Sequence, residues 1–198
     1  MSVSVEQIQE LRKKTGVGMM DSKKALIDAK GDFEQAVRIL REKGLADLSK
    51  RAARAVEEGV IESYIHANHK IGVLVEVNSE TDFVAHNAKF KEFAHDVALQ
   101  IAASDPQYVS IEDVPAEVID KEKELYAKQA KGEGKPEAVI EKIAEGKLAK
   151  FYEQIVLLEQ PFVKDPEMKI KDYLGSIAAS LGENIRIARF VRLQLGQD

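Results

Sequence analysis

The chain has 198 residues, of which 44% are hydrophobic and 32% are charged, and its formal net charge is −5. This composition is typical of a soluble folded protein, and the acidic balance argues against direct binding to nucleic acid. The absence of cysteine excludes disulfides, thiolate zinc sites and a cysteine nucleophile. The N-terminus has no signal-peptide pattern, and no apolar run approaches the roughly 18 residues of a membrane span, so we expect a cytoplasmic protein without membrane contact.

Residues 4–44 are predicted to form three short helices around a small core. Ser4 is a candidate N-cap of the first helix, and Gln7 lies where it would complete a capping box. Gly31 is expected to end the second helix and Gly44 the third, because glycine accepts the left-handed conformation that follows a helix. The expected buried stripes comprise Val5, Ile8, Leu11, Ala25, Leu26, Ala29, Phe33, Ala36, Val37 and Leu40. So small a core leaves little room for an active-site cleft and suits an adaptor module.

The middle and the end of the chain carry strand signals. Residues 60–78 predict a β-hairpin with β-branched strands and a turn at 67–70. An amphipathic helix is expected over 88–103, with Asn87 as its N-cap. The run 185–195 predicts a third strand beside the hairpin. Its apolar residues at alternate positions are expected to share one face: Ile185, Ile187, Val191, Leu193 and Leu195.

The fold class predicted from these patterns is α+β. A three-helix domain over residues 1–44 is expected to connect through a charged helical linker, 45–58, to a core domain, 59–198. The core should contain a three-stranded antiparallel sheet with helices and a long antiparallel helical hairpin at about 115–159. The tight turn of that hairpin is expected at Gly132-Glu133-Gly134-Lys135, followed by a proline that suits the start of a helix.

No catalytic constellation is visible in the sequence. The Gly132–Lys135 turn lacks the spacing and the Ser or Thr of a phosphate loop, and it does not follow a predicted strand. His66 and His69 flank the hairpin turn, but without a cysteine or an obvious third ligand they do not make a zinc site. Carboxylates on the helical hairpin alternate with lysines, which indicates a solvated face. We therefore expect no enzymatic activity, no metal site and no cofactor.

Two apolar features allow two interpretations. Met19 and Met20, at the junction of the first two helices, either fill the small core or form an adaptable contact surface, and the sequence alone favours the core. Phe83 lies seven residues before Phe90, so periodicity favours a core position for it as well. The alternative is an exposed aromatic held on a short turn that Ser79 could cap.

Two segments resemble the signatures of one protein family. Residues 11–26, LRKKTGVGMMDSKKAL, are closely similar to the N-terminal signature of translation elongation factor Ts, and residues 81–87, TDFVAHN, resemble its second signature. Both occur in the family's order and at about its spacing. Residues 160–163 and 182–185 are also similar to family segments, so the resemblance covers essentially the whole chain.

The resemblance implies a guanine-nucleotide exchange factor for the GTPase elongation factor Tu, acting in translation elongation and making no covalent bonds itself. It implies that the N-terminal bundle is like a ubiquitin-associated domain and docks on the partner's nucleotide-binding domain. By motif match, the docking residues are Leu11, Arg12, Met19 and Met20. The segment expected to insert near the partner's switch region and to help dislodge its Mg²⁺ is Thr81, Asp82, Phe83 and Val84. This match reverses the periodicity argument and makes Phe83 an exposed wedge.

Two departures from the family pattern bear on these expectations. His86 stands where the family usually has Lys or Arg, so a fixed positive charge is not expected there. The chain also resembles one half of the long family form, which predicts a homodimer, and the lack of cysteine means that it could not be disulfide-linked. The alternatives are a non-exchanging adaptor for polypeptide or ubiquitin-like partners, which gives residues 81–87 no purpose, and a hydrolase or metalloenzyme, for which no constellation exists.

Overall fold

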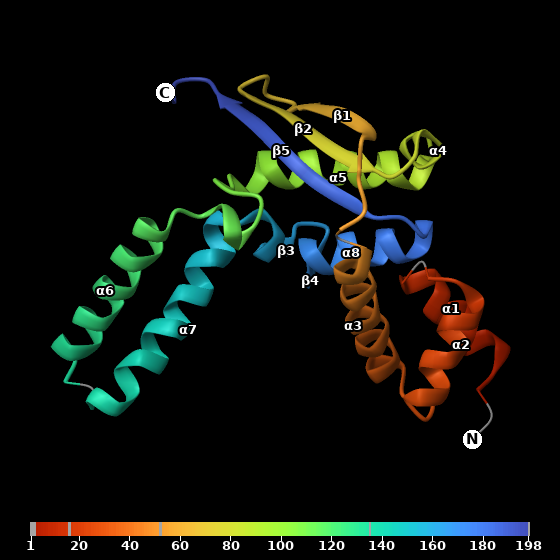
Figure 1. Cartoon of the computed structure of the whole chain (residues 1–198), viewed down its shortest axis with the longest axis horizontal. Helices are drawn as coiled ribbons and strands as arrows, with labels where there is room; N and C mark the ends of the chain where they lie inside the picture. Colours follow the sequence, from red (N-terminus) through yellow and green to blue (C-terminus); the bar gives the residue numbers. More distant parts are fainter. Residues whose placement is uncertain (1–2, 16, 52, 135, 198) are drawn as a thin grey trace. The chain divides into compact units, whose positions relative to one another are not determined.

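The computed structural model describes residues 3–15, 17–51, 53–134 and 136–197, with side chains at all of these except 45–51, 137 and 138. The predicted α+β class is confirmed: three N-terminal helices precede a three-stranded sheet with helices, and a helical hairpin follows (Figure 1). The chain divides into two compact units, residues 1–99 with 171–198 and residues 100–170. No helix among the described residues is long and apolar enough to span a membrane.

The N-terminal helices are α1 (Val5–Thr15), α2 (Met19–Asp28) and α3 (Phe33–Arg51). The predicted capping box of α1 is confirmed: Ser4 N donates to Gln7 Oε1 at 3.0 Å, and Gln7 N donates to Ser4 Oγ at 3.1 Å. Every residue of the expected stripe is in the bundle core or packs against it except Val5, which is exposed. Val5 is the residue directly after the N-cap, one turn before the first buried position.

The third helix is longer than predicted, because it continues past Gly44 to Arg51. Gly31 has the left-handed φ of a residue that follows a helix, whereas Gly44 does not. Gly44 is instead a helical residue at a close approach, since a Cβ there would lie 3.2 Å from the carbonyl oxygen of Gly175. The expected helical linker is therefore helical only in its first half, and residues 53–57 form no regular element.

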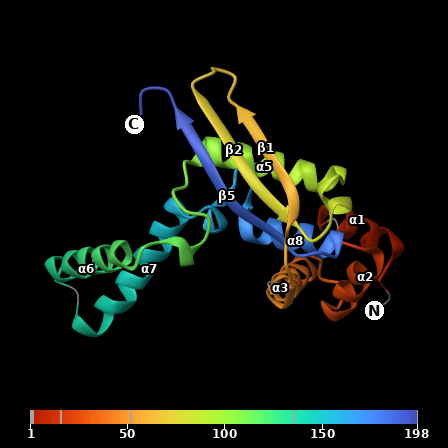
Figure 2. The same cartoon turned by 45° about the horizontal axis from the view of Figure 1, so that its top comes forward.

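The sheet consists of β1 (Glu58–Ile65), β2 (Ile71–Ser79) and β5 (Ile185–Gln194), all antiparallel, with β2 in the centre (Figure 2). The predicted hairpin and the predicted third strand are both confirmed. The expectation that the apolar residues of β5 share one face is wrong. Val77 pairs with Ile187 and Glu76 pairs with Arg189, so Ala188 is an extra residue that shifts the alternation.

The main core lies on the inner face of this sheet, beneath which α5 (Ala88–Ser104) runs, and α8 (Ile170–Leu181) contributes its own buried face (Figure 1). The rings of Phe93 and Tyr173 meet edge to face at 5.1 Å. The Tyr173 hydroxyl donates to Asp96 at 3.0 Å. Burial and the negative charge of Asp96 raise the pKa of Tyr173 well above its usual range, so this phenol remains a neutral donor inside the core.

The helical hairpin of α6 (Ala116–Gly132) and α7 (Glu137–Ile155) is confirmed, and it belongs to the second unit. Buried amides support the loop that follows it: Gln100 Nε2 donates to Gln160 Oε1 at 3.1 Å, and Val163 N donates to Gln100 Oε1 at 2.9 Å. The shorter elements are α4 (Asp82–Ala85), the 3-10 helices η1 (Ile111–Asp113) and η2 (Leu157–Glu159), and the strands β3 (Pro161–Phe162) and β4 (Asp165–Lys169).

Gly59 generates a stability prediction. Its φ is +148°, and a Cβ there would lie 2.2 Å from the carbonyl oxygen of Val77. We expect Gly59→Ala to lower the free energy of unfolding by about 1–3 kcal/mol, because the strand must shift or accept backbone strain. Gly146→Ala in α7 is the matched control, since nothing lies within 4 Å of a Cβ there; it should be neutral or stabilising by about 0.5–1 kcal/mol. Urea unfolding followed by circular dichroism measures both, and equal effects would contradict the argument.

Candidate functional site

The segment between β2 and α5 is a short capped turn. Thr81 has extended backbone angles, and its Oγ1 accepts a hydrogen bond from Val84 N at 3.4 Å, so Thr81 is the N-cap of α4. The expectation that Ser79 caps this turn is wrong. Strand β2 extends to Ser79, which is buried and whose hydroxyl donates to the carbonyl oxygen of Thr81 at 3.0 Å. Ser79 therefore supports the cap residue and leaves the capping to Thr81.

Phe83 projects from this turn into solvent with 84% of its surface exposed. Asp82 is also exposed, Val84 is half-buried and Ala85 is buried. The periodicity argument for a core position fails because α4 ends before α5 begins, so the two helices do not share one phase. Asn87 caps α5 as predicted, accepting Lys89 N at 2.9 Å, and Phe90 is the first phenylalanine of the core.

His86 closes the turn at its C-terminal end. Its backbone N donates to the carbonyl oxygen of Asp82 at 2.9 Å, and its ring Nδ1 lies 2.7 Å from the same oxygen. With Nδ1 protonated, both groups donate to one acceptor, which stabilises the last carbonyls of a very short helix. The imidazole side chain thus has a local structural contact within the turn.

A carboxylate from a distant part of the chain holds the start of the same turn. Glu183 Oε2 accepts the backbone N–H groups of Glu80 and Thr81, each at 3.1 Å, and Glu183 Oε1 accepts the Thr81 hydroxyl at 2.6 Å. Glu80 in return accepts Asn184 N at 2.5 Å. Sequence reasoning assigned no role to Glu183 or Asn184. The available signal was the similarity of residues 182–185 to a family segment.

The predicted docking residues lie in the N-terminal bundle, apart from the turn. Met20 is 76% exposed and Met19 38%, so the preference of the sequence for core positions is wrong for both. Arg12 is exposed as well, whereas Leu11 is completely buried in the bundle core. Arg12, Met19 and Met20 can therefore form a contact surface, and Leu11 can only support it from below.

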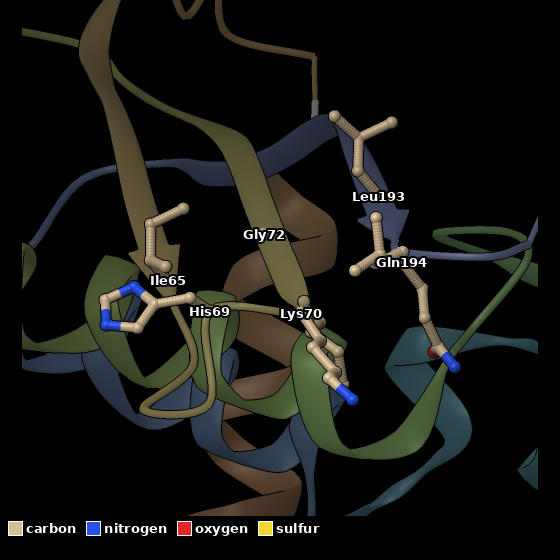
Figure 3. A pocket seen from close by; sticks show the side chains of 8 residues that line it. Ile65, His69, Lys70, Gly72, Leu193 and Gln194 are labelled. Atoms are coloured by element: carbon tan, nitrogen blue, oxygen red, sulfur yellow. The ribbon is translucent and has the colours of Figure 1, made fainter.

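The side of the sheet opposite the core is apolar and exposed. We call this surface the outer sheet face, and it comprises Ile61, Ile65, Leu74, Val191, Leu193 and Leu195. The register places Leu74 opposite Val191, and Gly72 between Ile65 and Leu193. Because Gly72 has no side chain, a hollow of about 320 Å³ opens there, near the β1–β2 turn and the end of β5 (Figure 3).

Charged side chains border the outer sheet face beyond Leu74. Arg189 Nε donates to Glu76 Oε2 at 2.8 Å. This hydrogen bond, together with one from Asn78, lowers the pKa of the Glu76 carboxyl. Among the residues with described side chains, no group of three or more His, Asp or Glu side chains is arranged to hold a metal ion.

Comparison with known proteins agrees with the motifs on these surfaces. The family model described as "Elongation factor TS" matches residues 5–197. "Elongation factor Ts" of Thermodesulfovibrio yellowstonii is 57% identical over 197 residues, covering 100% of this chain and 98% of that protein. "Elongation factor Ts" of Carboxydothermus hydrogenoformans is 55% identical over 195 residues, covering 98% of this chain and 90% of that protein. The match spans the bundle, the turn with Phe83 and the sheet together, and on that ground the chain belongs to the elongation factor Ts family.

Proposed function

We propose that this chain releases GDP from elongation factor Tu by inserting the turn that carries Phe83 into the partner. Elongation factor Ts is the nucleotide exchange factor for elongation factor Tu in translation elongation, and it catalyses no bond-making step. The observation that carries the wedge role is the 84% exposure of a phenylalanine on a turn anchored by hydrogen bonds. The alternative of a non-exchanging adaptor gives this anchored aromatic no purpose.

Exchange requires differential affinity. A factor that binds the GDP-bound and the nucleotide-free partner equally well shifts nothing, however tightly it binds. Contacts that the factor makes only with the nucleotide-free partner weaken the binding of GDP. By the reciprocity of coupling, GDP weakens the binding of the factor to the same degree. Burying Phe83 in a pocket that opens when the nucleotide leaves would contribute about 1.5–3 kcal/mol to this difference.

Residues 81–84 also suit the proposed step on Mg²⁺. Asp82 places an exposed carboxylate beside Phe83, and carboxylate oxygens are ligands that Mg²⁺ prefers. The half-buried Val84 follows Phe83 in the same turn. We assign to Thr81, Asp82, Phe83 and Val84 together the displacement of Mg²⁺ from the partner's nucleotide site, with Thr81 fixing the turn.

Docking is assigned to the N-terminal module, residues 1–44, joined by 45–58 to the core domain, 59–198. Methionine side chains adapt to irregular surfaces, and the side chain of Met20 is exposed. The next residue, Asp21, forms an ion pair with Lys43, so charged groups lie beside this apolar contact. Arg12 adds a donor for acidic or backbone groups of the partner. Contacts of this kind raise affinity for both states of elongation factor Tu.

Homodimerisation through the outer sheet face is the second part of the proposal. Six exposed aliphatic side chains on one sheet surface are costly to leave in water, and such a patch is typical of an interaction site. In a symmetric dimer each side chain would occur twice, so the same apolar surface serves both partners. The interface needs no disulfide, because the chain contains no cysteine.

The first prediction of this proposal concerns Phe83→Ala. Because the side chain is exposed, the melting temperature should stay unchanged, while stimulated GDP release should slow by roughly ten- to a hundredfold. Stopped-flow fluorescence with labelled GDP on elongation factor Tu measures the rate. Leu125→Ala, which truncates an exposed apolar side chain outside the turn, is the control. Chelation of Mg²⁺ should shrink the difference between wild type and variant, and unchanged exchange would refute the wedge.

The second prediction separates docking from exchange. Met20→Glu should raise the concentration of factor that gives half-maximal exchange by roughly tenfold, because an apolar contact is replaced by a charge. The maximal rate at saturation should stay close to that of wild type. Val5→Glu, at another exposed apolar position of the same bundle, should change neither quantity. A lower maximal rate with unchanged half-saturation would argue against a docking role.

The third prediction tests the dimer. Wild-type protein should sediment as a dimer at micromolar concentration. Leu193→Glu should raise the dissociation constant by about a hundredfold or more, because each chain loses a buried aliphatic contact worth about 1.5–3 kcal/mol. Leu125→Glu, outside the outer sheet face, should remain dimeric. A wild-type protein that sediments only as a monomer would refute this proposal and leave the wedge untouched.

A further inference from the structure

We infer that Glu183 is a positioning residue for nucleotide exchange, whose carboxylate holds the turn that presents Phe83. The inference rests on the proposed role of Phe83 as the wedge. Glu183 accepts three hydrogen bonds from the residues just before Phe83, namely from Glu80 N, Thr81 N and the Thr81 hydroxyl. Hydrogen bonds to an ionised carboxylate are about twice as strong as neutral ones.

The fold brings Glu183 to this position through the end of α8. Gly182 adopts a φ of +80°, and its N–H donates to the carbonyl oxygen of Ala178 at 2.9 Å. This left-handed residue ends the helix and turns the chain toward β5, and an L-residue side chain would be strained there. Glu183 follows directly, next to the end of strand β2.

The contact is reciprocal, which fixes the two segments against each other. Glu80 accepts Asn184 N at 2.5 Å and pairs with Arg54 at 3.2 Å. The Asn184 amide donates to the carbonyl oxygen of Arg54 at 3.1 Å. The start of the turn is thereby tied to the α8–β5 connection by hydrogen bonds in both directions.

The Thr81 hydroxyl links this clamp to the wedge. It donates to Glu183 at 2.6 Å and accepts Val84 N at 3.4 Å, so the carboxylate orients the group that caps α4. Helix α4 has four residues, which is too short to be stable by itself. Phe83 buries almost nothing in the free protein, so it does not anchor the turn either. Without Glu183 the turn should sample several directions, and insertion would have to order it at a cost in free energy.

The first measurement reports on the turn without any partner. The chain has no tryptophan, so Phe83→Trp introduces a single fluorescent probe at the wedge. Adding Glu183→Ala should lower the anisotropy of this tryptophan, with Glu183→Gln in between, because the amide keeps one acceptor. Glu112→Ala, an exposed carboxylate in η1, should leave the anisotropy unchanged. Equal anisotropy in all four proteins would overturn the inference.

The second measurement is GDP release from elongation factor Tu as a function of factor concentration. Glu183→Ala should lower the maximal rate about tenfold, the size expected when a half-buried, charge-assisted hydrogen-bond contact is lost. Half-saturation should stay within about twofold, because docking is separate. A change in half-saturation alone would overturn a positioning role. If Glu183→Ala fails to fold, as judged by circular dichroism, Glu183→Gln and Thr81→Val carry the test.

A double-mutant cycle with Phe83→Ala distinguishes the inference from the proposed function. If Glu183 acts through the wedge, Glu183→Ala should add little to Phe83→Ala. Additive losses would place the action of Glu183 elsewhere and overturn the inference. If Phe83→Ala exchanges normally, the wedge itself is refuted, and the anisotropy of Trp at position 83 still decides whether Glu183 holds the turn.

Discussion

An aromatic side chain that is exposed to solvent makes no packing contacts that could fix its own backbone, and this constraint applies to the turn between β2 and α5 that carries Phe83. Phe93 and Phe90 are fixed by burial, whereas Phe83 is 84% exposed. The direction of Phe83 therefore depends on polar contacts: the Thr81 cap, the bond from Ser79 and the carboxylate of Glu183. Hydrogen bonds around Phe83 thus take the place of hydrophobic burial, and they leave its ring exposed, as the proposed wedge role requires.

The sheet solves a related problem with its two faces. Its inner face is covered by α5 and contains the buried valines of β2, while the outer sheet face carries exposed aliphatic residues. The extra residue Ala188 marks the point where the apolar residues of β5 change from the inner face to the outer sheet face. Before it, Ile185 and Ile187 point into the core; after it, Val191 and Leu193 point outward. One bulge thus allows a single apolar strand to contribute to the core at one end and to the exposed outer sheet face at the other.

Local signals in the sequence identified the elements well, because caps and turns act over three or four residues. The Ser4–Gln7 box and the Asn87 cap are of this kind. Exposure is different, because it depends on what the rest of the chain covers. Met19, Met20 and Phe83 have the residue types and spacing of core positions, and only the family resemblance indicated otherwise. The bulge at Ala188 has no local signature, and the contact of Glu183 with Thr81 joins residues 102 positions apart.

The division between docking and wedge has a thermodynamic reason. In the proposed mechanism, contacts made by Met20 and Arg12 form whether or not GDP is bound, so they would concentrate the factor on its partner without favouring release. Only contacts that form when the nucleotide site is disrupted can loosen GDP. In the proposed mechanism those contacts are made by a four-residue helix. If the turn were mobile, the free energy needed to order it would be subtracted from the effect. If Phe83 is the wedge, exchange requires that its turn be held in place. The carboxylate of Glu183, remote in the sequence but adjacent in the fold, would hold the turn without covering the aromatic ring.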